Sequence, residues 1–283
     1  MYRDNVNIRE ALYDQNYDLL AASEDSNVIG LVEVIACSAD GKRKLFTKTI
    51  RKNELLVTGS VFMMEKNNGF RSKFTTTPID VELGVHAASE VNTSSAMIPN
   101  EIVCGIMVGN GGAGDTINTV RKVNRAARMV PGPLPIRVVP ATADLNATER
   151  DKYILRKPRG EYIYYYGKRF DNTPVMSVMY EDGTVVPTNV GDLTSNNKFI
   201  RAYTTYTATL NRYDIREYHK ITQGSTIKSF VNSVGLITGY PGVAADGKIE
   251  YFNVRGMTTL NMENRELKDS ESWITFIYRQ FIQ

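Results

Sequence analysis

The chain has 283 residues, of which 42% are hydrophobic and 23% are charged, and this composition excludes an intrinsically disordered protein. Its net charge of +3 argues against a protein that binds nucleic acid over its whole surface. Two cysteines are too few for a disulfide framework, and no apolar run approaches the roughly 20 residues of a membrane-spanning helix. The polar start does not resemble a signal peptide, so we expect a protein of a reducing, soluble compartment without membrane contact.

The first elements differ from the rest of the chain. In residues 1–27, Ile8, Leu12 and Leu19 roughly share one face of a helix, which predicts a short N-terminal helix or arm. From Val28 onward the pattern changes to strands. We therefore expect an arm over residues 1–27 and a β-rich domain over residues 28–283.

Asp-Gly pairs occur at 40–41, 182–183 and 246–247, each between two strand-like runs. Both residues tolerate the positive φ angles of a type I′ turn, so each pair predicts a β-hairpin. Three hairpins spread along the chain indicate antiparallel sheets. The fold class that we expect is mainly β with one or two helices (α+β), with an antiparallel β-sandwich or jelly-roll-like core.

Further strands are predicted from runs of β-branched and aromatic residues, at 55–64, 78–88, 161–170, 199–210 and 273–281. The closing run, "WITFIYRQF", alternates between two rows that are both partly apolar. Asn, Ser and Gly content predicts loops at 65–73, 90–100 and 189–197. A boundary between two parts of the β-rich domain is expected near residues 86–100, if there is one.

The stretch "IVCGIMVGNGGAG" ends an apolar run with the spacing G-x-G-x-x-G, formed by Gly109, Gly111 and Gly114. A helix is predicted over residues 116–130, capped at its start and stopped by "PGPLP". A strand, this glycine spacing and a helix, in that order, are typical of the turn that binds the pyrophosphate of a dinucleotide.

Two features argue against a dinucleotide site. No acidic residue occurs between Asp115 and Asp144 to bind ribose hydroxyls, although Arg137 could serve an NADP-type site. The motif also lies mid-chain, with hairpins after it. We therefore expect no cofactor, and glycines that permit positive φ or close backbone approach. An NAD(P)-binding enzyme using Gly109, Gly111 and Gly114 remains an alternative.

The predicted helix carries Arg121, Arg125 and Arg128 on one face, with Lys122 beside them. No acidic residue of the helix compensates these four charges. They are candidates for contact with phosphate groups or with an acidic partner surface.

A second basic cluster precedes a run of tyrosines. Arg156 and Lys157 come just before Tyr164 and Tyr166, and such interleaving can bind single-stranded nucleic acid through phosphate contacts and stacking. A β-hairpin with tyrosines on both faces would account for the same residues. We favour subunit contact for these four residues and keep single-stranded nucleic-acid binding as a second alternative.

Catalytic candidates are few. His219 lies near Asp214 and Glu217, but no Ser or Cys nucleophile has the flanking residues of a nucleophile elbow, and no Cys/His spacing fits zinc. We expect a protein that is not an enzyme, with no metal and no catalytic residues.

Three stretches together resemble virion structural proteins of tailed bacteriophages, of the head-to-tail connector, neck or baseplate type. They are "IVCGIMVGNGGAG", "ERDKYILRKPRGEYIYYYGKRF" and "YDIREYHKITQGSTIKSFVNSVGLITGYPG". The resemblance lies in the general character of these stretches and in the order of their motifs, and it covers residues 100–255.

This resemblance implies a non-enzymatic subunit that is made in the host cytoplasm and resides in the virion. It would assemble into a homo-oligomer, a ring or collar around the DNA channel, together with other virion structural proteins. The arginines of residues 116–130 would then face acidic partner surfaces or packaged DNA. The predicted helix and glycine loop depart from a simple tail-tube protein.

Overall fold

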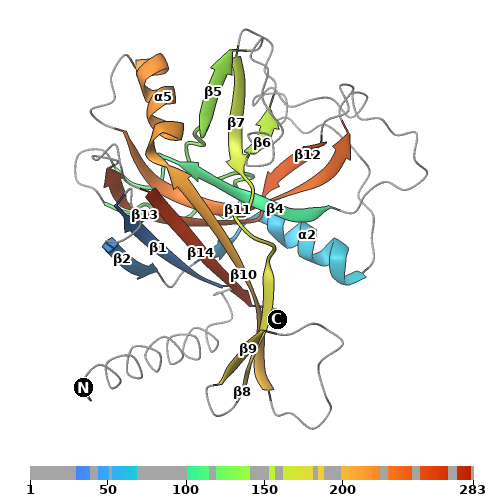
Figure 1. Ribbon diagram of the computed structural model, residues 1–283. Coiled ribbons are helices and arrows are strands. Elements are labelled where there is room, and N and C mark those ends of the chain that lie inside the picture. Colours follow the sequence, from blue (N-terminus) through green and yellow to red (C-terminus); the bar gives the residue numbers. More distant parts are fainter. Residues whose placement is uncertain are drawn as a thin grey trace, which may run out of the picture.

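A computed structural model describes residues 30–38, 44–50, 53–68, 101–114, 119–140, 153–156, 162–180, 184–187, 199–223, 229–243, 249–266 and 273–281. The strands within these residues form two sheets, and every pair of neighbouring strands is antiparallel. The expected fold class, mainly β with one or two helices and an antiparallel, sandwich-like core, is therefore confirmed (Figure 1).

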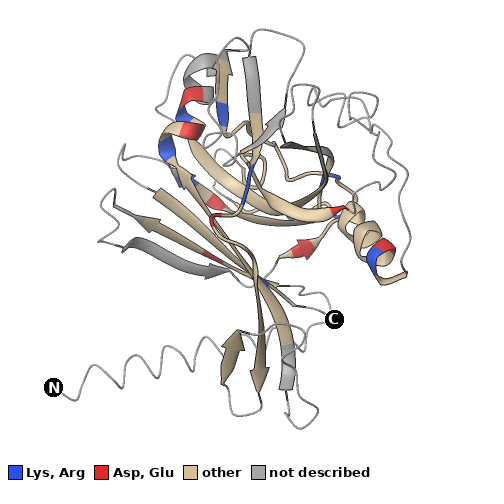
Figure 2. Ribbon diagram, turned by 45° about the vertical axis from the view of Figure 1, so that its right-hand side comes forward, with Lys and Arg blue, Asp and Glu red and all other residues tan. Residues whose placement is uncertain are grey.

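The first sheet has the strand order β2-β1-β14-β10-β8-β9. Its strands are β1 (Gly30–Cys37), β2 (Lys44–Ile50), β8 (Val175–Tyr180), β9 (Val185–Pro187), β10 (Phe199–Asn211) and β14 (Trp273–Phe281). In Figures 1 and 2, β8 and β9 project from the body of the molecule together with one end of β10. A small apolar cluster of Leu31, Met179, Tyr203 and Phe281 supports this projecting end.

The second sheet has the order β3-β13-β11-β4-β7-β5, with β12 paired to β11 and β6 paired to β7. Its strands are β3 (Glu54–Leu55), β4 (Ile102–Gly109), β5 (Arg137–Pro140), β6 (Tyr153–Arg156), β7 (Tyr162–Lys168), β11 (Phe230–Val243), β12 (Ile249–Gly256) and β13 (Thr258–Glu266). The long strand β11 pairs with β13 along its first part and with β12 along its last part.

Three hairpins confirm the Asp-Gly prediction. Strand β1 pairs with β2, β8 with β9, and β11 with β12, and each pair is joined across one of the three Asp-Gly positions. The turns themselves lie outside the described residues. Pairing β6 with β7 also confirms the hairpin expected within the basic and tyrosine-rich cluster.

The main core lies where the two sheets pack against each other. Strand β14 shows the pattern most clearly, because Ile274, Phe276 and Tyr278 are buried while the alternate row is partly exposed. These side chains join Val32 and Val34 of β1 and residues of β4, β11 and β13 in one cluster. Burial of each large side chain contributes about 1.5–3 kcal/mol relative to its exposed state.

Within the described ranges, two helices flank the sheets: α2 (Val57–Asn68) and α5 (Arg212–Gln223). Neither is long and apolar enough to be a candidate membrane span in the part of the chain that the structure describes. The strand expected at residues 55–64 is therefore wrong beyond Leu55. Phe62 is buried but Val57, Val61 and Met64 are exposed, a spacing of four and three that belongs to a helix.

The helix predicted over residues 116–130 is also wrong, because residues 119–130 are not helical. Their backbone groups bond to other parts of the chain instead, as described below. The expected N-terminal helix or arm, the strand at 78–88 and the boundary near 86–100 all lie outside the described residues.

Candidate protein interaction surface

Residues 119–130, which we call the strap, cross from the end of β4 to the junction of β12 and β13. The amide of Arg121 donates to the carbonyl of Gly112 at 2.9 Å, next to an isolated bridge between Ala113 and Val120. Further on, the carbonyl of Arg125 accepts from the amide of Val57 at 2.7 Å. The carbonyl of Arg128 accepts from the amide of Gly256, also at 2.7 Å. These bonds replace the intrahelical ones that local periodicity favoured, so tertiary contacts decide the conformation.

Asparagine side chains from β11 and β13 fix the start of the strap. The Oδ1 atom of Asn232 accepts from the amide of Gly112 at 2.6 Å, and its Nδ2 donates to the carbonyl of Asn110 and to Oδ1 of Asn264. The Nδ2 atom of Asn261 donates to the carbonyl of Arg121 at 2.9 Å. Buried backbone groups are costly without partners, so these amides hold the loop and the strap in one position.

The first two glycines of the G-x-G-x-x-G motif allow close backbone approach. A Cβ atom on Gly109 would lie 2.2 Å from the carbonyl oxygen of Pro131, and one on Gly111 would lie 2.8 Å from the amide nitrogen of Gly132. A Cβ atom on Gly114 would meet nothing nearer than 4.0 Å. Strand β4 pairs antiparallel with β11, and no helix occupies residues 119–130, so the strand-turn-helix context of a dinucleotide turn is not formed there.

The four basic side chains of the strap, Arg121, Lys122, Arg125 and Arg128, are all exposed. None forms an ion pair with another described residue. Their side-chain hydrogen bonds are long contacts to carbonyls: Arg121 to Gly111 at 3.5 Å and Arg125 to Leu55 at 3.3 Å. By contrast, acidic and basic positions lie together on α5 and at the C-terminal end of α2 (Figure 2). The strap thus presents positive charge that no described acidic residue neutralises.

An exposed apolar row lies on α2, beside the strap. Val57, Val61 and Met64 are 46%, 39% and 61% exposed and share one side of the helix, and we call them the outer row. The hydrogen bond from the amide of Val57 to Arg125 places the first turn of α2 directly against the strap. Exposed apolar groups next to charged ones are typical of surfaces that bind other proteins.

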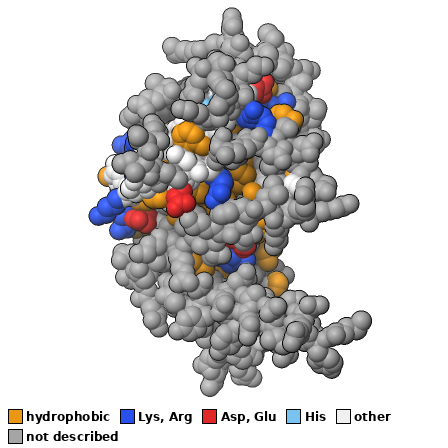
Figure 3. All heavy atoms as spheres, turned by 90° about the vertical axis from the view of Figure 1, so that its left-hand side faces the viewer, with side chains coloured by type: hydrophobic (Ala, Val, Ile, Leu, Met, Phe, Trp, Pro, Cys, Tyr) orange, Lys and Arg blue, Asp and Glu red, His pale blue; other side chains and the backbone are white. Residues whose placement is uncertain are grey.

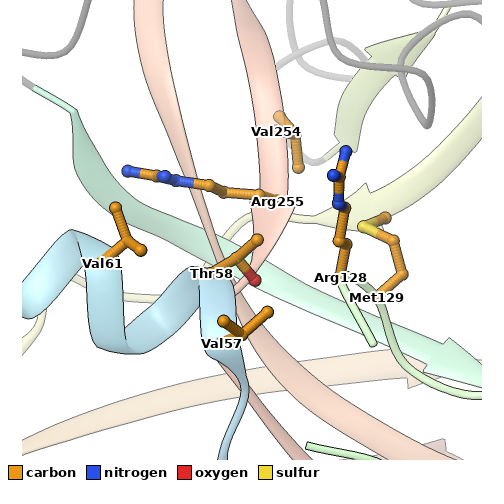
Figure 4. A pocket seen from close by; sticks show the side chains of 7 residues that line it. All are labelled: Val57, Thr58, Val61, Arg128, Met129, Val254 and Arg255. Carbon is orange, nitrogen blue, oxygen red and sulfur yellow. The ribbon is translucent and has the colours of Figure 1, made fainter. Parts of the chain in front are cut away.

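A pocket of about 310 Å³ opens where α2, the strap and β12 meet (Figure 4). Figure 4 shows the α2 side chains on one side, those of the strap opposite, and those of β12 between them. The lining is mostly apolar and consists of Val57, Thr58, Val61, Arg128, Met129, Val254 and Arg255.

The two arginines of the pocket differ in their electrostatic surroundings. Arg255 donates from Nε and Nη2 to the two carboxylate oxygens of Glu101, and from Nη2 to Glu65 at 2.7 Å. Burial opposes the charge of Arg255, but the bonds to Glu101 and Glu65 outweigh it and hold the pKa of Arg255 above its usual value. Arg128 has no ion pair with a described residue, so it is the cation of the pocket available to a ligand.

The second basic cluster is only partly described. Arg156 lies opposite Tyr164 in the β6–β7 pairing, but their side chains and Lys157 lie outside the described part. Tyr166 is half-buried against the apolar cluster that contains Cys104 and Met107. The structure therefore places Tyr166 at the edge of the core.

A buried polar group under α5 was not anticipated from the sequence as a unit. The hydroxyl of Tyr153 hydrogen-bonds to Asp214, and Arg137 and Lys168 lie close enough to act on the same carboxyl. Burial raises the pKa of Asp214, and the Tyr153 hydrogen bond and the two cations oppose that rise. These residues come from β6, α5, β5 and β7, so no local pattern could have joined them.

His219 is buried on the same helix, as expected for a structural histidine. In the described residues, no group of three or more His, Cys, Asp and Glu side chains could hold a metal ion. We interpret the polar group under α5 as a structural link between this helix and the second sheet.

No family model, curated protein or solved structure matches the chain. The strap cations, the outer row and the pocket, together called the interaction surface, combine positive charge, exposed apolar area and a recess. Chemically, this arrangement can bind a partner that offers carboxylates next to apolar side chains.

Proposed function

We propose that the chain is a non-enzymatic structural subunit that acts by assembly, and that its interaction surface binds a protein partner with acidic and apolar side chains. The proposed setting is the neck, collar or tail of a tailed-bacteriophage virion, which follows from the resemblance of residues 100–255 to such proteins. Copies of the chain form a closed ring around the DNA channel, together with other virion proteins.

One observation carries this proposal: four cations without an ion pair to described residues lie beside an exposed apolar row. Each feature alone has ordinary explanations on a protein surface. Together, and joined by a pocket with Arg128 at its edge, they match the apolar centre and charged rim of a protein interface. The asparagine bonds to the loop and strap hold this surface in place before a partner arrives, which lowers the entropy lost on binding.

Contact with packaged DNA is a second candidate for the strap. Guanidinium and ammonium groups without acidic neighbours bind phosphates well. The apolar outer row beside them has no counterpart in a phosphate backbone, and it favours a protein partner. On the face shown in Figure 3, the visible described basic side chains lie in separate groups, with hydrophobic and acidic side chains among them. The described side chains of that face do not form a continuous basic field.

The test compares the assembly of the wild type with that of a variant in which Val61 and Met64 are replaced by glutamate. Light scattering over a range of concentrations measures the mass of each. We expect a larger species for the wild type and its loss in the variant. Val175→Glu with Val186→Glu is the matched control, because these valines are 46% and 40% exposed on β8 and β9. Equal masses for wild type and the α2 variant would argue against this surface.

A further inference from the structure

We infer that the interaction surface receives residues 1–27 of a neighbouring copy of the chain, so that subunits are linked by an exchanged N-terminal segment. This inference rests on the proposed function, because it requires that copies assemble. It names the partner of the surface and the part of that partner that binds.

Charge complementarity is the first argument. Residues 1–27 contain six acidic side chains and two basic ones, a net charge of −4, whereas the whole chain has +3. Residues 28–283 therefore carry +7. An asymmetry of this size within one chain favours contact between the two parts, and the strap holds four of the cations available for it. The acidic residues are Asp4, Glu10, Asp14, Asp18, Glu24 and Asp25.

Apolar side chains lie among these acids in the sequence. Ile8, Leu12 and Leu19 alternate with Glu10 and Asp14, so a bound segment brings carboxylates and apolar groups to the same place. The interaction surface offers the same two chemistries side by side. Its pocket of about 310 Å³ is at the small end of the roughly 300–1,000 Å³ range of ligand pockets, a size suited to an anchoring side chain. Arg128 at the pocket can then bind a neighbouring carboxylate.

The length of the segment allows exchange between subunits. A chain of 27 residues spans up to about 90 Å when extended. It enters the described fold at Gly30 in the first sheet, whereas the interaction surface is built on the second sheet. A segment of this length can leave its own subunit and reach the next one.

The experiment places a photo-crosslinking residue on the outer row of the full-length chain, as Val61→p-benzoylphenylalanine. Unlabelled and nitrogen-15-labelled copies are mixed, assembled and irradiated, and mass spectrometry identifies the cross-linked peptides. We expect peptides from residues 1–27 joined to α2, with mixed isotope content. The same probe at Tyr213, which is 58% exposed on α5, is the control and is expected not to capture residues 1–27.

Two results would overturn the inference. One is the absence of residues 1–27 from the peptides joined at position 61. The other is capture of residues 1–27 only from the same copy, without mixed isotope content. Light scattering of the same sample distinguishes failure of the exchanged segment from failure of self-assembly. An oligomer without these cross-links overturns the exchanged segment alone, whereas a monomer at all concentrations also removes the self-assembly on which it rests.

A charge swap provides an independent readout. Lys122 has no side-chain hydrogen bond to a described residue. Lys122→Glu is expected to lower the cross-link yield about threefold, because one surface ion pair with the bound segment is lost and replaced by repulsion between two carboxylates. Lysine is then introduced in the same chain at each of the six acidic positions of residues 1–27 in turn, Asp14→Lys among them, and at least one of these double variants is expected to restore the yield. Asn172→Glu with Thr173→Glu, on an exposed loop, adds the same negative charge and is expected to leave the yield unchanged. Equal loss in the control, or no rescue, would contradict pairing with the strap.

Discussion

Replacement of Gly109 by alanine tests whether the glycine motif is structural. The new Cβ atom would lie 2.2 Å from the carbonyl oxygen of Pro131, where ordinary contacts are 3.4–4 Å, so that carbonyl must move by more than about 1 Å. The same oxygen accepts hydrogen bonds from the amide of Gly111 at 3.0 Å and from Oγ of Ser233 at 2.8 Å. Both bonds weaken when it moves.

The expected cost follows from these two effects. Overpacking of this kind costs about 1–3 kcal/mol, and each disturbed hydrogen bond adds about 1 kcal/mol, so Gly109→Ala is expected to lower the free energy of unfolding by about 3–5 kcal/mol. Gly114→Ala is the matched control, because its Cβ atom meets nothing nearer than 4.0 Å. Its effect is expected to stay within about 1 kcal/mol, and a small stabilisation follows if the unfolded chain loses entropy.

Urea unfolding followed by circular dichroism measures both variants against the wild type. A large loss for Gly109→Ala with near-neutral behaviour of Gly114→Ala supports close backbone packing as the reason for the motif. Equal and small effects at the two positions would refute the packing argument. Equal and large effects would show that Gly114 has a role that the space around it does not reveal.

Three further predictions concern other parts of the molecule. Burial raises the pKa of Asp214 above its usual value, so the stability that this carboxyl contributes is fully present below its unfolded-state pKa and is lost as the pH rises through its folded-state pKa. Asp214→Asn is therefore expected to gain stability relative to the wild type as the pH rises through this range, measured by urea unfolding. A difference between the two proteins that does not change with pH would contradict this. Glu101 is buried and is the bidentate partner of the partly buried Arg255, so Glu101→Gln is expected to cost about 2–4 kcal/mol. Glu65→Gln, at the more exposed end of the same network, is expected to cost about 1 kcal/mol or less. Equal costs for these two variants would argue against Glu101 as the main partner. NAD or NADP at millimolar concentration is expected to leave the melting temperature unchanged, and a clear rise would revive the nucleotide alternative.

The antiparallel β fold could be predicted because its strongest signals are local. An Asp-Gly pair between two strand-like runs specifies a tight hairpin by its own backbone preferences, and all three predicted pairings are confirmed. The closing strand was equally readable, since its residues alternate along the sequence. Which of its two rows is buried could not be read, because both contain apolar residues and only the facing sheet distinguishes them.

The strap and α2 could not be predicted, for related reasons. The strap has helical periodicity, but its backbone and that of the loop before it hydrogen-bond to side chains more than one hundred residues away. Asn261 bonds to the strap, and Asn232 bonds to the loop. Helix α2 is apolar on both sides, because Phe62 packs inward while the outer row faces outward, so its run of apolar residues resembled a strand.

The candidate site was half predictable. The four cations of the strap stand out in the sequence, since no acidic residue accompanies them. The residues that line the pocket beside them could not be recognised as a group, because they come from α2, the strap and β12, which are far apart in the sequence. The pairing that neutralises Arg255 and leaves Arg128 available joins residues 154 positions apart, a relation that only the fold reveals.

The mass of the full-length chain in solution, measured by light scattering over a range of concentrations and followed by negative-stain imaging of the same peak, tests assembly most directly. A closed ring with a fixed cyclic number of subunits is the predicted result. A chain that stays monomeric at every concentration would contradict self-assembly, and with it the proposal that the strap and α2 link one copy to the next.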